Sequence, residues 1–127
     1  MENSTTRNEL FIMKLLTQTQ EGNITWSKVN ESDIRITKIH NIIGKSFQCT
    51  IGNKDIIIYK YEYRAPIYAA FTEGWATAIG LNIFNQLDRF PDWSTNSIET
   101  KVLTNLYSIV ISLTNNIDTF IDDFIKK

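Results

Sequence analysis

The stretch from Phe47 to Arg64 constrains the fold more than any other part of the chain, because it predicts a β-hairpin. Apolar and polar residues alternate over Phe47–Ile51, which sends successive side chains to opposite faces of a strand. Gly52–Asp55 supplies turn residues, since Gly and Asn tolerate a positive φ. Ile56–Arg64 is β-branched and then aromatic, as expected of a return strand. The closed end of the hairpin is apolar on both faces, so we expect both faces to be covered there.

The composition predicts a single domain, residues 1–127, with enough apolar side chains for a core. Of the 127 residues 43% are hydrophobic, and the net charge is −1. The sequence contains no run of Lys and Arg that would neutralise duplex phosphates, so duplex nucleic acid is not an expected partner. No apolar run is long enough for a membrane span, and the polar N-terminus lacks the features of a secretory signal. The single cysteine fits a reducing compartment, so we expect a cytoplasmic protein.

A helix is predicted before the hairpin, from a cap among Asn3–Thr5 to about Gln20, with Gly22 as its stop. Trp26 is expected to cover the core, because an indole buries a large area. Lys28–Ser46 has no clear periodicity, and we interpret it as a partly ordered connection. The helix repeats apolar residues at helical spacing, which predicts a buried stripe of Leu10, Phe11, Met13, Leu15 and Leu16.

Beyond the hairpin, Pro66 is expected to end the second strand, because proline cannot donate a hydrogen bond to the ladder. Ile67–Trp75 is then interpreted as a loop. Ala76–Phe84 predicts a third strand, and Gln86–Thr95 is a turn-rich connection. Within the third strand the residues expected to face the core are Ile79, Leu81 and Ile83.

Two helices are predicted at the C-terminal end. Asn96 and Glu99 have the spacing of a capping box, so the first of these helices should begin there and continue through the apolar positions up to Leu113. The second helix has the clearest amphipathic pattern in the chain, and we expect its apolar stripe to pack on the sheet. The stripe consists of Ile117, Phe120, Ile121, Phe124 and Ile125.

These elements predict an α+β fold, a three-stranded or four-stranded antiparallel meander with an N-terminal helix and two C-terminal helices. A sheet this small leaves two edges that another copy can cover, so we expect a homo-oligomer.

The order of these features resembles that of small bacterial and phage proteins of about this size. It consists of a helix, Gly22 four residues before Trp26, a glycine-turned hairpin, Leu106–Tyr107 on a helix, and a short amphipathic tail. The resemblance covers most of the chain. It implies no activity and no functional residue, because no activity is established for those proteins.

Side chains that carry catalysis or bind metals are scarce. His40 and Cys49 are the one histidine and the one cysteine, they stand nine residues apart, and neither belongs to a metal-ligand motif. Cys49 is expected to be a buried and inert thiol. The sequence contains no phosphate-binding loop, no dinucleotide fingerprint and no nucleophile elbow. We therefore expect a protein that is not an enzyme and that uses neither a cofactor nor a metal.

Aromatic and basic residues gather around the end of the second strand, and they form the candidate site: Lys60, Tyr61, Tyr63, Arg64, Tyr68 and Trp75. Aromatic rings can stack on a planar base, and the planar fork of Arg64 suits a phosphate or carboxylate. The leading hypothesis is a non-enzymatic binding protein that holds or sequesters a small anionic or nucleotide-like ligand, such as a phage or bacterial signalling molecule. The alternative is an interaction module that inhibits or neutralises a partner protein through the same aromatic surface. A third interpretation assigns half of these side chains to the core, since one face of a strand must be buried.

Overall fold

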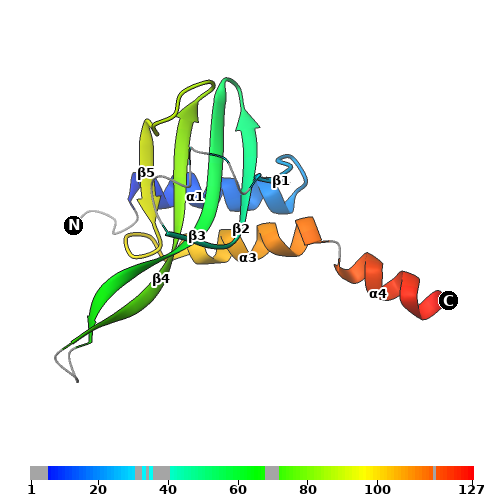
Figure 1. The fold of residues 1–127 in the computed structure, drawn as a ribbon. Coiled ribbons are helices and arrows are strands. Elements are labelled where there is room, and N and C mark those ends of the chain that lie inside the picture. Colours follow the sequence, from blue (N-terminus) through cyan, green and yellow to red (C-terminus); the bar gives the residue numbers. More distant parts are fainter. Residues whose placement is uncertain (1–5, 31–32, 34, 36–40, 68–71, 116) are drawn as a thin grey trace, which may run out of the picture.

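Five antiparallel strands form one sheet in the part of the chain that the computed structural model describes, which is every residue except 1–5, 31–32, 34, 36–40, 68–71 and 116 (Figure 1). The α+β class and the antiparallel meander are confirmed, with five strands in place of the expected three or four. In sheet order the strands are β1 (Ser27–Lys28), β2 (Asn41–Ile51), β3 (Lys54–Ile67), β4 (Thr72–Asn85) and β5 (Trp93–Asn96). The helices are α1 (Arg7–Gln20), α3 (Val102–Asn115) and α4 (Ile117–Lys126).

β2 is longer than the sequence pattern predicts, because a bulge interrupts its alternation. The register with β3 shifts between Ile43 and Phe47. Gly44 lies in this bulge at φ 69°, and Tyr107 Oη on α3 donates a 2.6 Å hydrogen bond to the carbonyl oxygen of Lys45. The segment before Phe47, interpreted from the sequence as a partly ordered connection, therefore contains the first part of β2.

β3 does not end before Pro66. It pairs with β4 over its whole length, with Pro66 opposite Glu73 and Ile67 opposite Thr72. Within the described residues β2 pairs with β3 only as far as Glu62, so β3 and β4 continue alone as a two-stranded arm (Figure 1). Proline is tolerated in this arm because one side of each strand lacks a neighbour and needs no donor. The prediction of a loop over Ile67–Trp75 is therefore wrong at both ends, because Ile67 belongs to β3 and Thr72–Trp75 belong to β4.

The helices α1 and α3 lie side by side on one face of the sheet and form the larger core with it (Figure 1). Side chains from β2, β3 and β4 alternate between this face and the other, as predicted for the third strand. The members of this core that are almost completely inaccessible to solvent include Ile12, Phe47, Ile58, Leu81, Leu103, Leu106 and Val110.

α1 starts later than predicted, and only part of the predicted stripe is buried: Leu15 is buried, and Phe11 and Leu16 are partly buried against the larger core. Thr6 caps the helix, with its Oγ1 accepting a 3.1 Å hydrogen bond from the Glu9 N–H, whereas Asn3–Thr5 lie outside the described residues. Leu10 and Met13 were expected to be buried, but they are 56% and 44% exposed. Packing against α3 selects the buried face, since nearly every position from residue 10 to residue 16 is apolar and the sequence cannot rank them. The buried residues of α1 are Ile12, Leu15 and Thr19.

Trp26 covers the core as predicted. Its indole is buried, and Nε1 donates a 3.0 Å hydrogen bond to Thr19 Oγ1 on α1. Gly22, which precedes it at φ 82°, ends α1 in the left-handed conformation that glycine adopts without strain.

The opposite face of the sheet carries a second core, so both faces of the β2–β3 hairpin are covered as predicted. Val29, Ile57, Tyr59 and Phe84 are buried there. Val29, directly after β1, lies on this face, and its N–H donates a 2.8 Å hydrogen bond to the Ser46 carbonyl oxygen. The described part of the chain contains no helix of the length and apolar character needed to cross a membrane.

The start of α3 differs from the prediction. Asn96 ends β5, and its Oδ1 accepts a 3.2 Å hydrogen bond from the Glu99 N–H in a turn. This contact has the spacing of a helix cap, but α3 begins only at Val102. The capping pattern therefore marked a turn before the helix.

Cys49 lies in the larger core, as predicted, and burial raises the pKa of its thiol to about 12, with the charge of Asp55 adding to the effect. The thiol is therefore protonated at neutral pH and shielded from reagents.

We expect native Cys49 to react with a maleimide roughly 100-fold more slowly than in the unfolded chain, because labelling needs an opening of the core. Mass spectrometry of the labelling time course measures this difference. Equal rates in the two states would contradict the packing.

Candidate functional site

The predicted site residues divide between the two faces of the sheet, because they alternate along β3. Tyr61 and Tyr63 lie on the face of the second core. Lys60 and Arg64 point to the other face, where Arg64 pairs with Trp75 of β4. Tyr68 lies outside the described residues. The structure therefore brings these residues together as two groups, one on each face.

The tyrosines form a ladder of rings on the second face. The ring centroids of Tyr59 and Tyr61 lie 5.8 Å apart, and those of Tyr61 and Tyr63 lie 6.0 Å apart. Tyr59 and Tyr61 are buried and Tyr63 is half-buried. Burial raises the pKa of Tyr61, and the charges of Tyr63 and Glu99 raise it further. Most of this ladder is therefore core, as the third interpretation of the sequence expected.

The ring of Tyr59 lies across Gly80 of β4. A Cβ atom at position 80 would stand 2.6 Å from both Cε2 and Oη of Tyr59, so only glycine fits beneath the ring. Tyr59 Oη donates a 3.1 Å hydrogen bond to Asn82 Oδ1. Asn82 is 1% exposed, and its Nδ2 has no hydrogen-bond partner among the described residues. A buried amide donor is thus left unsatisfied beside the tyrosines, which is unusual and costly.

Asn82 is one of the residues that line a small polar cavity of about 70 Å³. Glu99, which follows β5, contributes a carboxylate, and its Oε2 accepts a 2.8 Å hydrogen bond from Thr95 Oγ1. The lining therefore combines the amide side chain of Asn82 with the carboxylate of Glu99. Sequence reasoning missed this cavity, because its residues come from three strands and one turn. The lining residues are Tyr59, Tyr61, Asn82, Ser94, Thr95, Asn96 and Glu99.

Arg64 and Trp75 stack on the β3–β4 arm. The guanidinium carbon of Arg64 lies 5.2 Å from the centroid of the Trp75 ring, a cation–π geometry. Trp75 is 61% exposed and Arg64 is also exposed. This pair presents an aromatic and a cationic group to solvent at the part of the sheet that is only two strands wide.

Arg35 lies on the second face, where it contacts side chains of β2, β3 and β4. Its Nη1 lies 2.8 Å from Asp55 Oδ2 and its Nη2 lies 2.9 Å from Asp33 Oδ2 and from Gln48 Oε1. Its guanidinium also lies 5.4 Å from the ring centroid of Phe84. Desolvation raises the pKa of Asp33, but the hydrogen bonds and the charge of Arg35 outweigh it and hold that pKa below its usual value. Arg35 is satisfied by these groups, so its role is structural.

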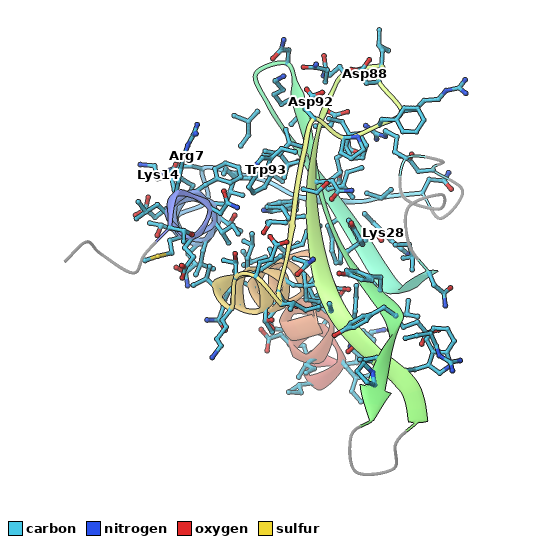
Figure 2. All side chains as sticks on the ribbon, turned by 90° about the vertical axis from the view of Figure 1, so that its left-hand side faces the viewer. Arg7, Lys14, Lys28, Asp88, Asp92 and Trp93 are labelled. Carbon is cyan, nitrogen blue, oxygen red and sulfur yellow. The ribbon has the colours of Figure 1, made fainter. Side chains whose placement is uncertain are left out.

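A mixed-charge cavity of about 430 Å³ lies between α1 and the β5 edge, where Figure 2 shows Arg7 close to Trp93. Trp93 packs edge-on against Phe11 with the ring centroids 5.5 Å apart. Lys54 Nζ lies 3.3 Å from Asp92 Oδ2, and both side chains are half-exposed, so this ion pair stabilises the fold by only about 0–1 kcal/mol. Lys54 and Asp92 pair with each other at this cavity, and Arg7 of α1 adds a further positive charge to its lining.

The prediction that α4 packs on the sheet is wrong. Figure 1 shows it leading away from the body of the protein beyond the end of α3. Phe120, Ile121, Phe124 and Ile125 are 63%, 46%, 68% and 72% exposed. The rings of Phe120 and Phe124 stack on each other with their centroids 6.3 Å apart. The most strongly amphipathic helix of the chain therefore presents its apolar stripe to solvent.

A groove of about 430 Å³ lies beside the last turn of α3. Trp26 and Phe47 line it together with Leu113, which is half-exposed. Lys28 and Lys45 also line it, and both are exposed. The groove thus combines apolar side chains with two positive charges.

Among the described residues, no three His, Cys, Asp or Glu side chains lie together in a group that could hold a metal ion. Comparisons with protein families, with curated proteins and with solved structures found no match to this chain.

Proposed function

We propose that this protein is a non-enzymatic interaction module in which α4 is the contact element. The observation that carries the proposal is the exposure of the large apolar side chains of α4, Phe120 and Phe124 above all. An amphipathic helix normally buries its apolar stripe, and a contiguous exposed apolar patch is typical of an interaction surface. Aromatic side chains one turn apart on a helix are also the anchors with which helices dock into a groove.

The Arg64–Trp75 pair supports the same function. Tryptophan and arginine are enriched among the residues that dominate binding energy at protein interfaces. This pair is exposed on the β3–β4 arm, which adds a second aromatic contact to that of α4. The aromatic surface of the proposed module thus consists of α4 and the arm, whereas Tyr61, which the sequence analysis assigned to that surface, belongs to the second core.

The proposal predicts that α4 contributes little to the stability of an isolated monomer. At concentrations where the protein is monomeric, Phe124→Ala should change the free energy of unfolding by less than about 0.5 kcal/mol, as exposed positions do. Leu106→Ala is the matched control, because Leu106 on α3 is fully buried and its truncation should cost ~2–5 kcal/mol. Urea denaturation followed by circular dichroism measures both. A loss in Phe124→Ala as large as that in Leu106→Ala would mean that α4 packs on its own protomer, which would refute the proposal.

A second candidate function is binding of a small nucleotide-like ligand at the polar cavity, and the unsatisfied Nδ2 of Asn82 favours it. A ligand group suited to this cavity presents an acceptor to Asn82 and a donor to Glu99. The edge of a nucleobase presents these two groups side by side. A phosphate is disfavoured there, because Glu99 brings a negative charge to the same cavity. The cavity is small, so only the edge of a base would enter it.

This second function predicts that nucleosides raise the melting temperature of the protein while ribose 5-phosphate, which lacks a base, does not. The rise should follow RT ln(1 + [L]/Kd). Glu99→Gln keeps an oxygen for the Thr95 hydroxyl but removes the charge, so it should reduce the shift without changing the melting temperature of the unliganded protein. Absence of any shift with the four common nucleosides at millimolar concentration would leave the cavity as a site for a structural water only.

A further inference from the structure

A cavity of about 350 Å³ lies between α3 and the strands β3 and β4, and Lys60 is the only charged residue among the described residues that line it. This volume lies within the range of roughly 300–1,000 Å³ that is typical of small-molecule sites. Four residues add aliphatic hydroxyl groups to the lining: Thr77 on β4, Ser97 in the turn after β5, and Thr104 and Ser108 on α3. The lining therefore combines one positive charge with several hydroxyl groups that can donate hydrogen bonds.

Lys60 lacks a counter-charge in the part of the chain that the structure describes. The residue is half-buried, and its side chain has no hydrogen bond or ion pair with any described residue. Glu62, two residues further along β3, instead accepts a 2.7 Å hydrogen bond from Asn41 Nδ2 on β2. A partly buried ammonium group without a partner loses hydration that nothing replaces. An anion in this cavity would supply the missing partner.

The hydroxyl groups of the lining are free to donate to such an anion. Ser97 is held by Ile79, whose carbonyl oxygen accepts a 2.8 Å hydrogen bond from the Ser97 N–H and whose own N–H donates a 3.0 Å hydrogen bond to Ser97 Oγ. This contact uses a lone pair of the Ser97 hydroxyl and leaves its hydrogen available. Thr104 and Ser108 lie one turn apart on α3, and neither hydroxyl is hydrogen-bonded to a described residue. Hydroxyl donors from two elements thus accompany the lysine.

We propose that this cavity binds a small monocarboxylate, with the carboxylate group at Lys60 and the hydroxyl groups of Ser97 and Ser108. One lysine balances the single negative charge that a carboxylate carries at neutral pH, whereas a phosphate monoester carries about 1.5 to 2 negative charges. Ala78 and Ile79 are buried and Ile111 is only partly exposed, so the apolar surface is small and the apolar part of the ligand is short. The inference goes beyond the proposed function, because it uses no residue of α4.

The first experiment titrates the full chain with butyrate and follows the backbone amide signals by NMR, with butyrate replacing chloride at constant ionic strength. The signals of Ser97 and Ser108 should shift with a Kd on the order of 1 mM, as a ligand of this size allows. Butyramide has the same shape without the charge, and it should bind at least tenfold more weakly. Ribose 5-phosphate should also bind at least tenfold more weakly than butyrate, because its second negative charge has no partner in the lining.

The second experiment tests Lys60 by substitution. Lys60→Met keeps most of the apolar stem and removes the charge, so it should weaken butyrate binding at least tenfold while Lys60→Arg, which keeps a cation, retains binding. Ser108→Ala removes one exposed hydroxyl and should weaken binding without changing the melting temperature of the unliganded protein. The matched control is Lys101→Met, which removes an exposed lysine outside the cavity and should leave binding unchanged.

Three results would overturn the site. Butyramide that binds as tightly as butyrate would show that charge is not recognised. Ribose 5-phosphate that binds more tightly than butyrate would assign the cavity to phosphate. Lys60→Met that binds butyrate as the wild type does, or amide shifts confined to residues outside this lining, would place the carboxylate elsewhere. None of these results depends on α4, so the interaction-module proposal is tested separately by Phe124→Ala.

Discussion

Replacement of Gly80 by alanine should destabilise the fold by about 3 kcal/mol, at the upper end of what an added methyl group costs in a packed core. Gly80 needs no special backbone conformation, so the cost is steric. The new Cβ would stand 2.6 Å from the ring carbon Cε2 and from the hydroxyl oxygen Oη of Tyr59. That ring cannot move aside, because it is buried in the second core and hydrogen-bonded to Asn82. Urea denaturation of the variant measures the loss.

A double-mutant cycle tests whether Tyr59 is the cause. Tyr59→Ala removes the ring, so in that background Gly80→Ala should cost less than about 0.5 kcal/mol or even stabilise the strand, since alanine loses less backbone entropy than glycine. Tyr59→Phe keeps the ring and loses only the hydrogen bond, so in that background the clash should persist. An equal cost of Gly80→Ala in all three backgrounds would place the clash elsewhere.

Replacement of Arg35 by leucine should destabilise the fold by ~3–5 kcal/mol, because it leaves two carboxylates without their cation. The side chains of Asp33 and Asp55 are only 19% and 12% exposed, so water can solvate them only in part. Arg35 also fixes the segment after β1 against Gln48 and Phe84, so that contact is lost in the same variant.

The control is the triple variant Arg35→Leu, Asp33→Asn and Asp55→Asn, which removes the buried charges together. It should recover a large part of the loss, because neutral amides cost less to bury than carboxylates. A triple variant as unstable as Arg35→Leu alone would mean that lost packing, and not unpaired charge, causes the effect.

The same network predicts how stability responds to acid. The pKa of Asp33 is lower in the folded protein than in the unfolded chain, where it is about 3.9. The stability that Asp33 contributes is therefore fully present above about pH 4 and is lost as the pH falls through the folded pKa. Asp33→Asn should lack this part of the acid dependence, which urea denaturation between pH 2 and pH 5 measures. An unchanged profile in Asp33→Asn would assign the dependence to other carboxylates.

The β2–β3 hairpin could be predicted from the sequence because its signals are local. Gly52 adopts φ 63° in the turn, and the isoleucines that follow it are buried on both faces. The alternation of Ile79, Leu81 and Ile83 toward the larger core is equally local, since period 2 follows from strand geometry alone. The burial of Trp26 and Cys49 could be predicted because both side chains are apolar and of types that are usually buried.

Features that depend on partners distant in the sequence could not be predicted in this way. The bulge around Gly44 hides the start of β2, because it breaks the period on which the prediction depends. A proline such as Pro66 predicts the end of a strand. It is tolerated here because it lies in the two-stranded arm, where each strand lacks a neighbour on one side. The polar cavity joins residues as distant in the sequence as Tyr59 and Glu99, and the Arg35 network joins Arg35 to Asp55 and Phe84.

The candidate site shows the same division. The sequence determined that Tyr61 and Arg64 point to opposite faces, because their separation of three residues is odd. It also determined that α4 is an amphipathic helix, because its apolar residues recur with the helical period of 3.6 residues. Only the tertiary structure decided that Tyr61 is core, that Arg64 lies over Trp75, and that the stripe of α4 faces solvent. Whether each of these side chains is buried depends on which residues pack beside it. Those residues are distant in the sequence, so the pattern of neighbouring residues does not identify them.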